Sequence, residues 1–115
     1  MTDLLQPDSL NQLKAILEDE FLQITALFAD QLPQEIDALH RAIAANDLAA
    51  INRKAHSIKG SCANLGAVAL AHQARLIEKA ALVPDLAAIH AAAATLPVLV
   101  DQTLAAMRSG GYLAP

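Results

Sequence analysis

The chain has 115 residues and a formal net charge of −4, with 55% hydrophobic but only 3% aromatic residues. This length suits one domain with one core, and the abundance of alanine, leucine, isoleucine and valine is typical of closely packed helices. The negative charge argues against nucleic acid binding, and the single cysteine excludes an internal disulfide and fits a reducing compartment.

The N-terminal segment has no basic start and no apolar run, so no secretory signal is expected. The longest apolar stretch, residues 91–100, is far shorter than the roughly 18 residues that a bilayer-spanning helix needs. Pro97 also interrupts this stretch. We therefore expect a cytoplasmic protein that contacts no membrane.

Helical periodicity runs along nearly the whole chain, and no segment alternates as a strand would. Ser9 and Gln12 fit a capping box that opens a short first helix carrying Leu13, Ile16 and Leu17. A second helix follows, and Pro33 inside it is expected to kink it. The apolar residues on one face of this second helix are Phe21, Ile24, Phe28, Leu32, Ile36, Leu39 and Ile43.

Asp47 is the expected N-cap of a third helix, and Gly66 can take the left-handed conformation that ends it. The inward residues of this helix are Ile51, Ala55, Ile58, Cys62 and Leu65. The spacing places Cys62 in the apolar stripe, as a small buried hydrophobic residue. A fourth helix follows, and Pro84 ends it. The inward residues of the fourth helix are Leu70, Ala74, Ile77 and Ala81.

A last helix is predicted to run from Leu86 to Met107 and to end at residues 109–111. Its inward residues are Leu86, Ile89, Ala93, Leu96, Val100, Thr103 and Met107. Short turns between long amphipathic helices favour antiparallel neighbours. The sequence therefore predicts one all-α domain over residues 1–115, an antiparallel up-down four-helix bundle with a short extra N-terminal helix.

His56 lies about 140° from the centre of the third helix's apolar stripe, so its ring should face solvent. Lys59 and Gly60 share its patch of helix surface, at i+3 and i+4. The segment from Leu48 to Ile77 carries four basic and no acidic residues, in an otherwise acidic chain. A neutral imidazole there is suited to nucleophilic attack on an anion, and the Lys59 ammonium could contact phosphoryl oxygens.

Gly60 interrupts a good helix, where glycine is less favourable than alanine by about 1 kcal/mol. One interpretation is that a bare helix surface beside His56 lets another protein's active site close over the ring. The other is close packing of Gly60 against a neighbouring helix. Gly60 lies even further from the apolar stripe than His56, which favours the first interpretation.

The segment "AHSIKGSCANLG" (55–66) resembles the signature of the histidine phosphotransfer (HPt) domain. That signature is His-x-x-Lys-Gly with a second glycine six residues later, here His56, Lys59, Gly60 and Gly66. The resemblance extends over the chain, because the family fold is an up-and-down four-helix bundle, often with a short N-terminal helix. It implies that His56 accepts a phosphoryl group on Nε2 from an aspartyl phosphate and passes it to another aspartate. Lys59 would then steady the phosphate, and Gly60 would give clearance.

The resemblance also implies a role for Glu78, which follows His56 by 22 residues. A carboxylate there would bond to the ring Nδ1–H, fix the tautomer and make Nε2 more nucleophilic. The alternative is a plain surface acid. Arg75, one turn earlier, would either reach the phosphate from the same side or be a solvated surface arginine. Ser61 would bond either to the phosphoryl group or to the carbonyl one turn before it.

The leading hypothesis is a freestanding phosphorelay intermediate between receiver domains of a hybrid sensor kinase and a response regulator. The resemblance implies a phosphocarrier rather than an enzyme, because the metal and catalytic acids belong to the receiver. We expect a monomer without cofactor, nucleic acid or membrane partner. The rival is an interaction module that binds a receiver or kinase without being phosphorylated. A metal or haem bundle is disfavoured, because the other histidines show no ligand spacing. These are His40, His72 and His90.

Overall fold

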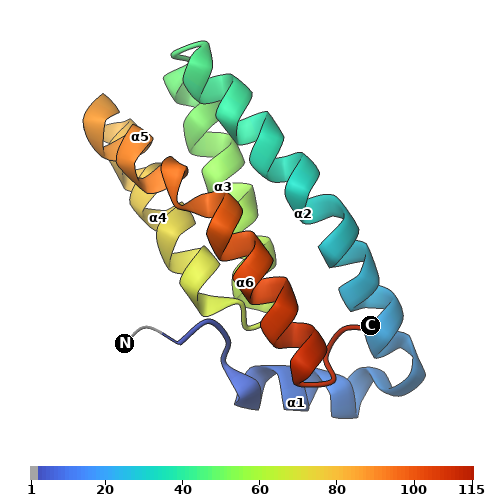
Figure 1. Ribbon diagram of the computed structural model, residues 1–115. Coiled ribbons are helices and arrows are strands. Elements are labelled where there is room, and N and C mark those ends of the chain that lie inside the picture. Colours follow the sequence, from blue (N-terminus) through green and yellow to red (C-terminus); the bar gives the residue numbers. More distant parts are fainter. Residues whose placement is uncertain (1–2) are drawn as a thin grey trace.

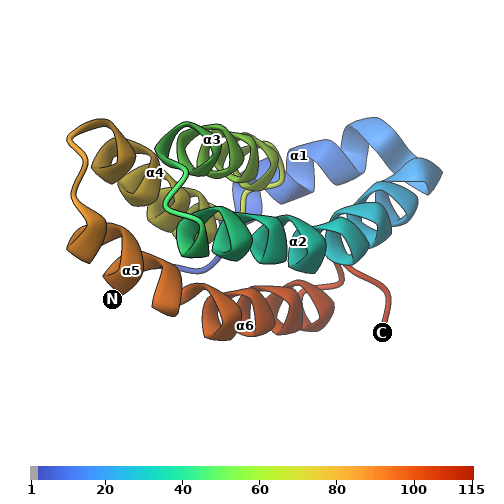
Figure 2. The same ribbon diagram turned by 90° about the horizontal axis from the view of Figure 1, so that it is seen from above.

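The computed structural model describes residues 3–115, and all regular structure within that range is helical. The helices are α1 (Pro7–Leu17), the 3₁₀ turn η1 (Glu18–Glu20), α2 (Phe21–Ala44), α3 (Leu48–Asn64), α4 (Val68–Leu82), α5 (Leu86–Ala94) and α6 (Leu96–Ser109). Helices α2, α3, α4 and the α5–α6 pair run in alternating directions, and α1 lies across one end (Figures 1 and 2). The predicted four-helix bundle with a short N-terminal helix is confirmed.

The core forms where the predicted apolar stripes meet. Two predicted inward residues are instead partly exposed, Ile24 by 38% and Leu86 by 44%. Fully buried side chains come from each long helix, among them Leu39, Ile51, Ile58, Leu70, Ile77, Ile89, Leu96 and Met107. Burying each of these side chains stabilises the fold by about 1.5–3 kcal/mol. This burial fixes the rotation of α3 and directs its opposite face to solvent.

The two ends of α3 are set as the sequence predicts. The Asp47 side chain accepts a hydrogen bond from the Ala50 N–H at 3.1 Å, which confirms the N-cap. Gly66 has a φ of +70°, and the Ala67 N–H returns to the Cys62 carbonyl at 2.8 Å. The Gly66 carbonyl also accepts a hydrogen bond from the Gln6 N–H at 2.8 Å. The turn after α3 therefore anchors the N-terminal segment.

The expected capping box of α1 is absent. The helix begins at Pro7, and the Ser9 hydroxyl donates to the Gln6 side chain at 3.2 Å instead of capping the backbone. Proline at the first helical position has its φ already set and no N–H to satisfy, so the helix starts before Ser9. Leu10 is the buried residue of α1, whereas Ile16 is 75% exposed.

Helix α2 continues through Pro33 as one 24-residue helix, and Pro33 lies on its exposed side. The last predicted helix is instead divided in two at Thr95. Pro97 cannot donate a backbone hydrogen bond and restricts the residue before it, so it starts a new helix. The Thr95 hydroxyl donates to the Ala92 carbonyl at 2.8 Å, and Gln73 of α4 donates to that hydroxyl at 3.0 Å.

Residues Leu86–Ser109, which form α5 and α6, are long and apolar enough to cross a membrane by length and composition alone, with a mean hydropathy of 1.2. The prediction from residues 91–100 missed this longer segment, because only the uninterrupted apolar run was counted. In the bundle, this segment contributes Ile89, Leu96 and Met107 to the core. Core helices of folded proteins meet the same criterion, so it does not by itself indicate a membrane span.

Candidate functional site

His56 lies on the outer face of α3, and its side chain is 68% exposed. The opposite face of the helix buries Ile51, Ala55 and Ile58 in the core. The expectation that the ring faces solvent is confirmed. An exposed imidazole of this kind is accessible to a second protein without any rearrangement of the bundle.

Glu78 of α4 lies between His56 and Lys59 of α3. Its Oε2 is 2.5 Å from His56 Nδ1, and its Oε1 is 2.6 Å from Lys59 Nζ. The backbone reinforces this contact between the helices, because the Asn52 side chain donates to the Glu78 carbonyl at 3.1 Å. The Glu78 side chain is only 15% exposed, so the carboxylate is held against the Nδ1 edge of the ring rather than in bulk solvent.

The charge of Glu78 determines which nitrogen of His56 carries the proton. The hydrogen bond from Lys59 lowers the pKa of Glu78 most, the bond to His56 lowers it further, and partial burial acts in the opposite direction. An ionised carboxylate only accepts hydrogen bonds, so His56 Nδ1 must be the donor. A neutral ring then has its lone pair on Nε2, the nitrogen that does not contact Glu78.

Lys59 is 30% exposed and its ammonium contacts the Glu78 carboxylate. The sequence did not indicate this pairing, because Lys59 was assigned to the phosphate alone. An ammonium group has three N–H donors, so one contact to Glu78 leaves others for a phosphoryl oxygen. Its phosphate-stabilising role stays a prediction.

Gly60 is exposed, and a Cβ atom built on it would meet nothing within 4 Å. This open space excludes the alternative that Gly60 packs against a neighbouring helix. The space lies one helical turn beyond His56, on the same face of α3. Clearance for a partner remains the interpretation that the geometry favours, and it stays a prediction.

The structure places Arg75 on the exposed surface of α4, one turn before Glu78. Neither of the ion pairs formed by residues 3–115 involves Arg75. Ser61 is half-buried between α2 and α3, and the described hydrogen bonds do not include one from its hydroxyl. The roles of both residues in phosphate binding stay predictions.

The other polar residues considered as site candidates include His40 and Cys62. The Nε2 atom of His40 lies 3.2 Å from the Ala93 carbonyl. Cys62 is fully buried, and burial raises the pKa of its thiol to about 12, so it is a neutral core residue as expected. Within residues 3–115, no group of three or more histidine, cysteine, aspartate or glutamate side chains could hold a metal ion.

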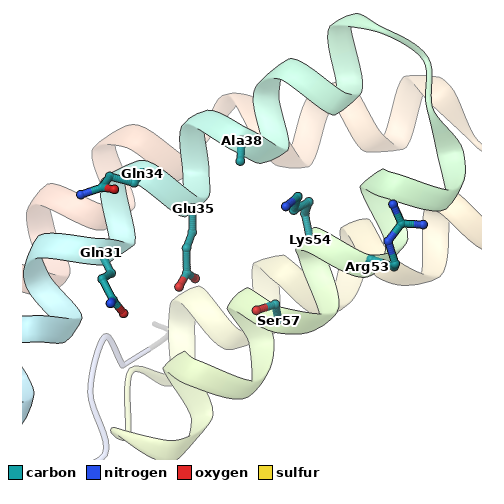
Figure 3. A pocket seen from close by; sticks show the side chains of 7 residues that line it. All are labelled: Gln31, Gln34, Glu35, Ala38, Arg53, Lys54 and Ser57. Carbon is teal, nitrogen blue, oxygen red and sulfur yellow. The ribbon is translucent and has the colours of Figure 1, made fainter.

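A groove between α2 and α3 was not expected from the sequence. It encloses about 470 Å³, and we call it the α2–α3 groove (Figure 3). It is lined by Gln31, Gln34, Glu35 and Ala38 of α2 and by Arg53, Lys54 and Ser57 of α3. Burial raises the pKa of Glu35, while the charge of Lys54 acts in the opposite direction. The sequence contained one signal for the position of Glu35. This residue lies three residues after Leu32 and four before Leu39, which places it beside the buried stripe of α2.

A family model for the Hpt domain matches residues 23–110, which include α3, α4 and His56. The chain belongs to this family. As an Hpt protein it is also similar to the crystal structure of histidine-containing phosphotransfer protein B (HptB) from Pseudomonas aeruginosa PAO1. The two are 25% identical, the match covers 96% of each chain, and the TM-score is 0.89. The comparison with curated proteins gives no match. Family membership gives the general function, histidine phosphotransfer by a phosphocarrier in a phosphorelay.

The Hpt site makes stability depend on pH through Glu78. Its folded-state pKa is lowered, so ionised Glu78 stabilises the fold above its unfolded pKa of about 4.3. This contribution is lost as the pH falls through the lower folded-state value. We expect Glu78→Gln to be less stable than the wild type by about 0.5–1 kcal/mol at pH 7.

Urea denaturation of both proteins at a series of pH values checks this expectation, and the difference should shrink as the pH falls below the unfolded-state pKa of about 4.3. Glu35 is present in both proteins, so its own titration cancels in the difference. A stability difference that persisted unchanged into acid would contradict the proposed contribution of the Glu78 charge.

Proposed function

We propose that this Hpt protein is a phosphorelay intermediate that transfers phosphoryl groups between receiver domains. His56 accepts the group from an aspartate of a hybrid sensor kinase and passes it to an aspartate of a response regulator. The observation that carries this proposal is the Glu78 carboxylate 2.5 Å from His56 Nδ1, on a ring that is 68% exposed. This contact leaves Nε2 as the nucleophile, and the exposure of the ring gives a partner access to it.

The transfer balances without further reactants. The Nε2 lone pair attacks phosphorus, an N–P bond forms, and the P–O bond to the partner's aspartate breaks, which regenerates its carboxylate. The ring keeps its Nδ1 proton and gains positive charge, which ionised Glu78 stabilises at hydrogen-bond distance. Attack by a second aspartate on the same phosphorus reverses these bond changes. The receiver supplies the metal and the catalytic acids, so the Hpt chain is a carrier rather than an enzyme.

The residues around His56 fit auxiliary roles in this transfer. Lys59 lies one turn further along α3 and can share its ammonium between Glu78 and the phosphoryl oxygens. Gly60 leaves open space for the rim of the receiver site. Exposed Arg75 lies one turn before Glu78 on α4, a position from which it would support the phosphate. The basic character of this surface would steer an anionic phosphorylated partner.

The docking face extends from α3 to α2. Leu27 is 55% exposed and Ile24 38%, and both line a hollow of about 250 Å³ that also includes Ser61, the residue after Gly60. Exposed apolar side chains next to the site would contribute affinity. A carrier must release each partner, so we propose a small, transient interface. We also propose that the protein acts as a cytoplasmic monomer and requires no cofactor.

The test is phosphotransfer from receiver domains of the source organism, each phosphorylated separately with labelled acetyl phosphate. We expect at least one receiver to transfer label to the Hpt protein. The label should be lost in acid and retained in alkali, as a phosphohistidine requires. If every receiver binds or ignores the protein without transferring label, the carrier function is wrong. Binding without transfer would support the rival, an interaction module.

A further inference from the structure

The α2–α3 groove contains a carboxylate oxygen that has no hydrogen-bond partner. Among the described residues, Glu35 Oε2 is the buried side-chain oxygen or nitrogen that remains unsatisfied. Neither of the ion pairs in residues 3–115 includes Glu35, although Lys54 lines the same groove. A buried acceptor is unfavourable unless a donor from outside the chain, either a water molecule or a group of a bound partner, reaches it.

The groove could admit such a donor. Glu35 projects from α2 toward α3, and Ser57 and Lys54 project from α3 into the same space (Figure 3). The enclosed volume of about 470 Å³ exceeds that of any single side chain and remains open to solvent. Glu35 also lines the neighbouring apolar hollow with Leu27 and Ser61, so this residue borders both cavities.

The groove lies beside the surface over which a partner of His56 would dock. Ser57, in its wall, directly follows His56 in α3. A partner covering His56 and Gly60 would therefore also cover the mouth of the groove. Arg53 and Lys54 are both in the lining and would repel a cationic side chain. An uncharged donor, such as a hydroxyl, amide or backbone N–H, fits this surrounding better.

We infer that the α2–α3 groove is a specificity pocket for the receiver domain, in which Glu35 Oε2 accepts a hydrogen bond from an uncharged donor of that receiver. This inference rests on the proposed function, because the occupant is the receiver that exchanges phosphate with His56. Glu35 is thus a partner-recognition residue that does not contact the reacting atoms. It should affect affinity and partner choice, while the transfer step in the assembled complex stays the same.

Glu35→Met tests the inference, because methionine has a similar size and its thioether is at most a weak acceptor. The probe is the receiver domain that gives the fastest transfer to the wild type. We expect the dissociation constant for this receiver to rise by about tenfold, as loss of a buried hydrogen bond implies. The single-turnover transfer rate at saturating receiver should remain that of the wild type. The melting temperature of the free variant should be unchanged or higher, because an unsatisfied buried oxygen is removed.

Two further variants make the result specific. Asp37→Met removes the same charge from an exposed position of α2 that faces α6, so binding should stay at the wild-type level. Glu35→Gln keeps an acceptor oxygen and should bind within about threefold of the wild type. If Glu35→Gln lost as much affinity for the receiver as Glu35→Met, the proposal that the donor is uncharged would be overturned. If Asp37→Met lost as much affinity as Glu35→Met, or if Glu35→Met lost none, the proposal of a specificity pocket would be overturned.

The outcomes also separate this inference from the proposed function. If the wild type accepts phosphate and Glu35→Met binds the receiver equally well, the relay stands and the specificity pocket is wrong. If no receiver phosphorylates the wild type, the relay fails and the inference fails with it.

Discussion

The His56→Gln variant is expected to fold like the wild type and to accept no phosphoryl group from any receiver. The loss should be complete, because Nε2 is the atom that forms the bond to phosphorus and a glutamine amide is not a nucleophile at neutral pH. The side chain at position 56 is 68% exposed, so its replacement should change the free energy of unfolding by no more than about 0.5 kcal/mol. Glutamine also keeps an N–H donor for Glu78.

Labelling by a phosphorylated receiver measures the loss, and His72→Gln is the matched control. His72 is an exposed histidine on α4, so the same substitution there should leave labelling intact. A third measurement, binding of the unlabelled receiver, separates chemistry from docking, because His56→Gln should still bind. Acid-labile label on His56→Gln at the wild-type level would show that another residue accepts the phosphoryl group.

The fold could be predicted because each helical segment carries its own local signals. Apolar residues recur at helical spacing in every segment, and Asp47 and Gly66 mark the two ends of α3. These signals act over one or two turns and need no knowledge of the rest of the chain. The errors came from competing local signals. Pro7 opened α1 ahead of the Ser9 capping box, and Pro97 divided the last helix at Thr95.

The site was predictable to the extent that it lies on one helix. The direction of His56 follows from its angle on α3, and the open surface at Gly60 follows in the same way. The pairing of Lys59 with Glu78 depends on the register between α3 and α4, which local periodicity does not define. The unsatisfied oxygen of Glu35 depends on how α2 packs against α3. Both features are long-range, and both appear only when the helices are assembled.

Gly60 should show opposite effects on stability and transfer. Gly60→Ala is expected to stabilise the fold by about 0.5–1 kcal/mol, because alanine favours the helix and its methyl group would meet nothing within 4 Å. Gly60→Leu should fold equally well but slow phosphotransfer by about 100-fold. Side chains in a helix lean toward its N-terminus, so a leucine at position 60 would cover the surface beside His56. Displacing the reacting atoms by about 1 Å is enough for a loss of this size.

Chemical denaturation and single-turnover transfer measure the two effects on the same proteins. Ala87→Leu, an exposed substitution on α5, places the same leucine side chain away from the site and should leave transfer unchanged. Gly66→Ala is the contrast for stability, because its φ of +70° and the Gln6 carbonyl 3.0 Å from the new Cβ make alanine unfavourable there. If Gly60→Leu transferred phosphate as fast as the wild type, the receiver would not approach over this surface. The presence of glycine at position 60 would then have no functional explanation. Close packing against another helix would not explain it either, because the space around Gly60 is open.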